Sequence, residues 1–98
     1  MDVNELFYRN VVYHCRSRRL KIGYIEMEAG VSQGYLSRIT NEKGRNRRIP
    51  LEIAAAFAKL LGVTVDDLIT VDLARERRIQ LLEQELEQLR REDGLPHQ

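Results

Sequence analysis

The residues of this chain that commonly act in metal sites or catalysis are few. His14 and Cys15 are adjacent, and the second histidine is His97 near the end of the sequence. The chain has no Cys-x-x-Cys or His-Glu-x-x-His spacing of metal ligands, no serine with a matching histidine and carboxylate, and no glycine-rich phosphate loop. We therefore expect no metal, no cofactor and no enzymatic activity, with His14 at the edge of a core.

Basic side chains are concentrated in the middle third of the chain. Residues 16–48 hold nine Lys or Arg against three acids, a net charge of +6, whereas residues 49–98 carry −4 and residues 1–15 carry −1. This asymmetry predicts either one surface that binds a polyanion or a solvated basic face. The charge distribution alone does not separate these two readings.

The apolar spacing predicts an all-α fold whose helices position these residues. Ser32 is expected to be the N-cap of the third helix, and Thr64 with Asp67 resembles a capping box for the fifth. The fourth helix is apolar nearly all round, so we expect it to be the central buried helix. The expected helices cover residues 5–17, 21–28, 32–41, 51–61 and 64–69, followed by a charged helix over 72–92.

The segment Lys21–Asn41 resembles the helix-turn-helix of the phage repressor and Cro (Xre-like) family. The resemblance is carried by the turn Ala29-Gly30-Val31-Ser32, the apolar set Ile25, Val31, Leu36 and Ile39, the run Tyr35-Leu36-Ser37-Arg38-Ile39, and the later segments Leu51–Val63 and Asp67-Leu68. It covers about residues 6–69. It implies a five-helix, repressor-like DNA-binding domain over residues 1–70. Beyond it the composition changes, and we expect residues 71–98 to form a C-terminal dimerisation helix with a frayed tail.

In that family the second helix of the motif enters the major groove. With Leu36 and Ile39 turned inward, the expected base contacts are Gln33, Gly34, Ser37 and Arg38. Gln33 stands at the first helical position, where its amide can pair with adenine, and Arg38 can reach guanine or a phosphate. The expected contacts to the DNA backbone are Ser32, Asn41, Lys43, Arg45, Arg47 and Arg48.

Three positions depart from the family pattern. Ile22 stands where many members have a glutamine that holds a phosphate, and Arg19 replaces a glycine after the first helix. Glu26 stands where a small residue is usual, so we expect it to tilt outward or to find a partner, for example a nearby arginine. The basic loop after Asn41 is hypothesised to supply the missing backbone affinity.

The last helix carries a short apolar seam. Ile79 and Leu86 at heptad position a, with Leu82 and Leu89 at d, favour a parallel two-stranded coiled coil. Parallel pairing would also match Arg78 with Glu83 and Glu85 with Arg90 across the two copies. The alternatives are an antiparallel pair and a helix that folds back onto its own domain.

These features together predict a cytoplasmic, sequence-specific regulator that binds double-stranded DNA as a homodimer on a palindromic site and represses transcription. The alternative is a protein–protein interaction module that uses the same fold and the acidic last helix to bind another regulator. The acidic N-terminus lacks the order of a secretory signal, and the most apolar stretch is shorter than the ~20 residues of a membrane span. We expect no membrane contact, and regulation through concentration, a protein partner or proteolysis.

Overall fold

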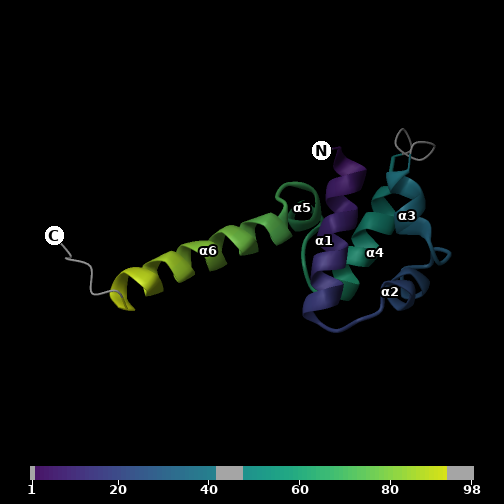
Figure 1. Cartoon of the computed structure of the whole chain (residues 1–98). Helices are drawn as coiled ribbons and strands as arrows, with labels where there is room; N and C mark the ends of the chain where they lie inside the picture. The colour runs from purple at the N-terminus through teal and green to yellow at the C-terminus, as the bar shows by residue number, and fades with distance from the viewer. Residues whose placement is uncertain (1, 42–47, 93–98) are drawn as a thin grey trace.

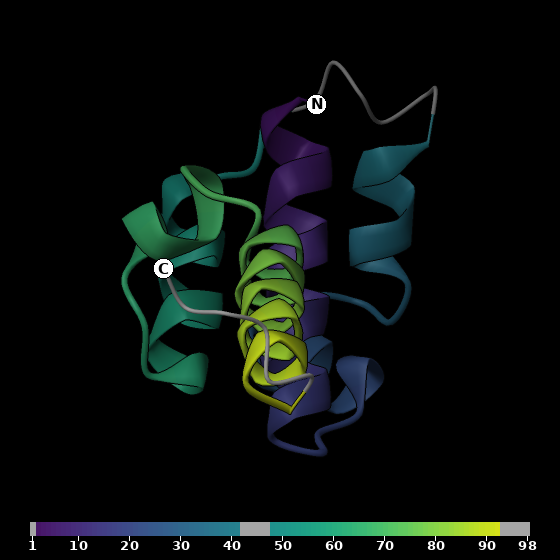
Figure 2. The same ribbon diagram turned by 60° about the vertical axis from the view of Figure 1, so that its left-hand side comes forward.

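The computed structural model describes residues 2–41 and 48–92, and within these ranges the regular elements are all α-helices (Figure 1). This confirms the all-α class. The helices are α1 (Val3–Ser17), α2 (Ile22–Glu28), α3 (Tyr35–Thr40), α4 (Leu51–Leu61), α5 (Val65–Ile69) and α6 (Leu73–Glu92). Helices α1 to α5 pack together as one body, and α6 extends from it (Figures 1 and 2).

Local capping signals fix several helix ends. The Asp2 side chain accepts a hydrogen bond from the Glu5 N–H at 2.8 Å and begins α1. The capping box predicted for α5 is confirmed, because the Thr64 hydroxyl accepts from the Asp67 N–H while the Asp67 carboxylate accepts from the Thr64 N–H. The hydrogen bonds from Thr64 lower the pKa of Asp67. Each cap satisfies amides that the helix itself leaves unpaired.

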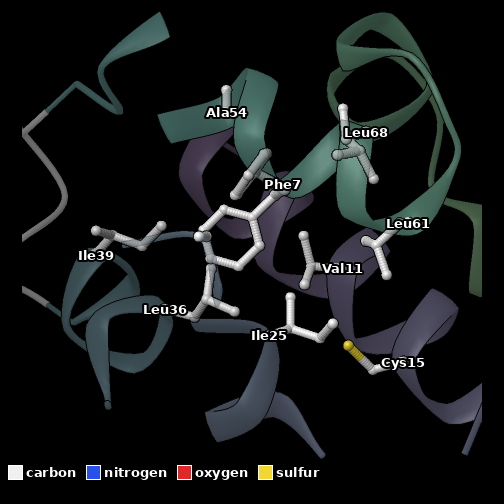
Figure 3. Close-up of a cluster of buried hydrophobic side chains, with 12 residues drawn as sticks. Phe7, Val11, Cys15, Ile25, Leu36, Ile39, Ala54, Leu61 and Leu68 are labelled. Atoms are coloured by element: carbon white, nitrogen blue, oxygen red, sulfur yellow. The ribbon is translucent and has the colours of Figure 1, made fainter. Parts of the chain in front are cut away.

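The core lies between the five helices of the body, with α1 in contact with each of the others (Figure 3). Phe7 of α1 and Phe57 of α4 meet edge to face, with ring centroids 5.6 Å apart and planes at 90°. Such aromatic pairs stabilise a core beyond the area that they bury. The fully buried side chains around them are Val11, Cys15, Ile25, Leu36, Leu61 and Leu68.

Helix α4 differs from the expectation that it would be buried all round. Its buried side chains, Ala54, Phe57, Ala58 and Leu61, lie on one face. Leu51 is 75% exposed and Leu60 is 40% exposed. The reason is that α4 packs against α1, α2 and α5 on its inner side, and a body of five short helices has no further element to cover the outer side.

A buried asparagine attaches α6 to the body. The Asn10 side chain, 0% exposed, donates to the carbonyls of Leu68 at 2.9 Å and Val71 at 2.6 Å. Its Oδ1 accepts from the Leu73 N–H at 2.9 Å. One α1 side chain thus satisfies three backbone groups between the end of α5 and the start of α6, which sequence analysis did not identify.

Beyond this attachment α6 extends into solvent. None of its residues is buried, and the longest dimension of the molecule is 56 Å. The fold-back arrangement considered from the sequence is therefore not the one found. Helix α6 leaves the body on the side away from α2 and α3 (Figure 1). In the described part of the chain, no helix has the length and apolar character needed to cross a membrane.

Candidate nucleic-acid interface

The polar residues predicted to contact bases lie together around the start of α3. Gln33, Ser37 and Arg38 are exposed and Gly34 is half-buried. Behind them, Leu36 is 1% exposed and Ile39 is 5% exposed, and both side chains belong to the core (Figure 3). Helix α3 therefore has one face fixed in the body and one polar edge open to solvent.

Helix α3 begins later than predicted. The expected N-cap, Ser32, does not cap it with its side chain; Tyr35 is the first helical residue and Gly34 is the N-cap, with φ +88°. The Tyr35 N–H bonds the Ser32 carbonyl at 3.1 Å, which closes a tight turn over residues 32–34. A left-handed φ favours glycine, so Gly34 can adopt the conformation that this turn requires. Gln33 accordingly lies in the turn and not at the first helical position.

Glu26 of α2 takes the capping role that Ser32 was expected to have. Of the two expectations for Glu26, outward tilt is wrong, because the residue is 2% exposed. It finds a partner instead, and that partner is the backbone and not an arginine. Its Oε1 accepts from the Gly34 N–H at 2.9 Å and its Oε2 accepts from the Leu36 N–H at 2.9 Å. The physical reason is that the first amides of a helix have no intrahelical partner, and a carboxylate satisfies both their hydrogen bonds and the positive end of the helix dipole.

Arg38 folds back over the same turn. Its Nη1 donates to the Gln33 carbonyl at 3.1 Å, and its Nη2 donates to the Ser32 hydroxyl. A Cβ at Gly34 would lie 3.0 Å from Arg38 Nη1, so the guanidinium rests directly on this glycine. The Ser32 side chain, predicted to contact the DNA backbone, is thus hydrogen-bonded to Arg38.

The Gln33 side chain lies against α2. A Cβ built on Gly23 would be 3.2 Å from Gln33 Nε2 and 3.5 Å from its Cδ. Gly23 therefore leaves the space that the Gln33 amide occupies. Sequence analysis missed Gly23, and a glycine in the first turn of a predicted helix was the available signal.

Of the residues predicted to contact the DNA backbone, Arg48 lies near α3. Arg38 and Arg48 both line a hollow of about 270 Å³ between α3 and the start of α4, together with Tyr35, Ile39, Pro50 and Ile53. Two arginines along one hollow give this part of the surface a positive charge, which favours an anion nearby. Asn41 is exposed just after α3. The predictions for Lys43, Arg45 and Arg47 fall outside the described residues.

The predicted seam lies on the projecting helix. Its four side chains are all solvent-accessible: Ile79 is 43% exposed, Leu82 57%, Leu86 52% and Leu89 54%. Leu81, outside the seam, is also 45% exposed. Beside the seam, Arg91 and Glu87 pair at 3.5 Å along the helix. The structure therefore presents the four seam residues on one helix without bringing any of them into the body.

No family model, curated protein or solved structure matches this chain. Conclusions about function rest on the geometry described above. Residues 2–41 and 48–92 hold no cluster of three or more His, Cys, Asp or Glu side chains that could bind a metal ion. In α1, His14 Nδ1 lies 2.7 Å from Arg18 Nη1, and burial followed by the Arg18 charge lowers the pKa of His14.

Proposed function

We propose that this chain is a sequence-specific regulator that binds double-stranded DNA through a helix-turn-helix formed by α2 and α3 within a five-helix, repressor-like domain. The observation that carries the proposal is the open polar edge of α3. Gln33, Ser37 and Arg38 are exposed there, while Leu36 and Ile39 anchor the helix from behind. A helix held in this way can enter a major groove with its N-terminal side chains toward base edges.

Charge supports DNA as the ligand. Residues 16–48, which include α2 and α3, carry a net charge of +6. Arg48 adds a cation beside Arg38 at the hollow next to α3. Phosphate contacts of this kind position a protein on the duplex, and the base contacts then select the sequence.

The regulator acts as a homodimer through α6. The exposed Ile79, Leu82, Leu86 and Leu89 would form the seam, and Arg78 with Glu83, and Glu85 with Arg90, would pair across it. Helix α6 has 20 residues, which is about 30 Å of helix. Parallel pairing keeps both bodies at one end of this coil, whereas antiparallel pairing would place the whole coil between them.

Parallel pairing therefore suits a palindrome whose half-sites lie about 34 Å apart, one turn of the duplex. Because α6 leaves the body on the side away from α2 and α3, pairing through α6 leaves both reading edges uncovered (Figure 1). A dimer bound across a promoter in this way would block access to it, so repression is the expected outcome.

Selection of bound duplexes from a random pool tests the proposal. We expect a palindromic consensus and an affinity that falls steeply with salt, with a log–log slope of about −0.9 for each phosphate neutralised. The competing candidate is a protein-binding module, which the exposed apolar side chains of α6 favour. Weak, unselective DNA binding together with tight association with a different protein would support that module and contradict the regulator.

A further inference from the structure

Three side chains hold the turn over residues 32–34 in one geometry, and we call Glu26, Ser32 and Arg38 the turn clamp. From the inner side, the Glu26 carboxylate accepts two backbone N–H groups, each at 2.9 Å. From the outer side, the Arg38 guanidinium bridges the Gln33 carbonyl and the Ser32 hydroxyl. The turn is therefore fixed from both faces, and Gln33 lies within it.

Arg38 and Gln33 differ in what their side chains already bind. Both terminal nitrogens of Arg38 donate hydrogen bonds within the turn, so this side chain must break two contacts before it can extend to a guanine. Within the described residues, the Gln33 side-chain amide makes no hydrogen bond. It lies against Gly23, where the absence of a Cβ leaves room for it. The amide of Gln33 is thus free to pair with a base, whereas the guanidinium of Arg38 is held against the turn by two hydrogen bonds.

We propose that Arg38 is a positioning residue and that Gln33 is the base reader at this edge. This inference rests on the proposed function and replaces the expectation that Arg38 itself reads a guanine. Arg38 and Ser32 hold the backbone of Gln33 at one height and angle over the groove. A bidentate contact between the Gln33 amide and adenine N6 and N7 requires a fixed backbone position, since two hydrogen bonds must be aligned at once.

Measuring the preference of wild type and variants for the base at each position of the site tests this assignment. The full chain first selects its best duplex from a random pool. Fluorescence anisotropy then gives Kd values for that duplex and for duplexes changed at each base pair, for wild type, Gln33→Ala, Ser32→Ala, Arg38→Ala and the double variant Gln33→Ala with Arg38→Ala. Ser17→Ala is the matched control for Ser32→Ala, because it also removes one exposed, hydrogen-bonded hydroxyl but lies at the end of α1, outside the turn clamp and the polar edge of α3.

We expect Gln33→Ala to lose about tenfold preference for adenine at one base pair. Arg38→Ala is expected to lose most of the preference at that same base pair, and Ser32→Ala to lose about threefold. The double variant should lose no more than Gln33→Ala alone, because a positioning residue has no effect once the reader is gone. Ser17→Ala should keep the wild-type preference at that base pair.

The opposite pattern would overturn the inference. If Arg38→Ala relaxes a different base pair from Gln33→Ala, and Ser32→Ala leaves every preference intact, then Arg38 leaves the turn and reads a base itself, while the proposed function stands. If the wild-type chain prefers no base pair at all, the proposed function fails and this inference with it. Should Arg38→Ala fold poorly by circular dichroism, Ser32→Ala decides the result, because it removes only one exposed hydroxyl.

Discussion

The turn between α2 and α3 and the projecting helix α6 hold their candidate functional residues in opposite ways. In the turn, a buried carboxylate, a left-handed glycine and a bridging arginine fix the backbone without any partner molecule. In α6, no side chain is buried, and the Asn10 hydrogen bond that holds the helix to the body lies at its first residue. The turn therefore has a defined geometry in the isolated chain. The apolar seam of α6, in contrast, would be covered only when a second surface packs against it.

This contrast predicts where substitutions will show their effect. Changes in the turn should alter the stability of the isolated chain at any concentration. Changes along the seam should alter only properties that depend on concentration.

The largest effect is expected from Glu26→Ala. The substitution leaves the Gly34 and Leu36 N–H groups without an acceptor in a buried place, so the free energy of unfolding should fall by about 3 kcal/mol. Urea denaturation followed by circular dichroism measures it. Glu28→Ala, at the exposed end of the same helix, is the control and should cost less than ~0.5 kcal/mol. Equal stability of the two variants would contradict a capping role for Glu26.

The next effect concerns the seam. Leu86→Ala should weaken dimerisation by about 2 kcal/mol, roughly a 30-fold rise in the dimer dissociation constant, because it removes apolar surface that only the second copy covers. Sedimentation equilibrium measures this constant. Leu81→Ala is the control, since Leu81 is similarly exposed but lies on another side of α6. If the control weakens the dimer as much, the assigned heptad register is wrong.

A smaller effect is expected from Gly23→Ala, which should raise the stability of the protein but weaken its base preference. Gly23 has no left-handed φ and lies in the first turn of α2, so alanine should raise the free energy of unfolding by about 0.5–1 kcal/mol. The new Cβ would lie 3.2 Å from Gln33 Nε2 and displace the amide. Thermal denaturation and Kd values on the selected duplex should show a more stable protein with severalfold weaker preference at the base pair of Gln33. Unchanged preference would show that reading does not depend on this resting place.

The smallest effect is a pH dependence from His14. Burial and then the Arg18 charge lower the pKa of His14, against a weaker opposing effect of Asp67. The folded state therefore binds the proton less readily than the unfolded state, whose pKa is near 6.5. Stability from this group is complete above about pH 6.5 and decreases as the pH falls below it. Thermal denaturation between pH 7.5 and 5.5 should show the decrease, and His14→Gln should flatten it; an equal slope in both proteins would assign the effect to other groups.

The parts of the fold that sequence predicted depend on neighbours three or four residues apart. The spacing of Phe7, Val11 and Cys15 gave α1, and the three-residue spacing of Thr64 and Asp67 gave the capping box of α5. The grouping of polar side chains at the exposed edge of α3 followed from the same rule, once Leu36 and Ile39 were placed inward. Such signals can be read from the sequence because the helix itself brings these residues together.

The parts that sequence did not predict depend on contacts between helices. Glu26 caps α3 from eight and ten residues away, and Asn10 binds backbone groups 58 to 63 residues later. No periodic rule links those positions, so sequence analysis did not identify the backbone partners of Glu26, and Asn10 went unnoticed. The exposed side of α4 was missed for a related reason: the composition of a helix does not say which neighbours will cover it.

The attachment through Asn10 has a consequence for helical phase. Because this side chain fixes the Leu73 N–H to α1, the direction in which the seam faces is determined by the body and not by α6 alone. Each residue inserted into an α-helix rotates everything beyond it by about 100°. In the proposed dimer, one residue added between Leu73 and Ile79 would turn each body by that angle about its own α6, relative to the seam. The angle between the two bodies, and therefore the operator spacing that they fit, depends on how the start of α6 is held against α1.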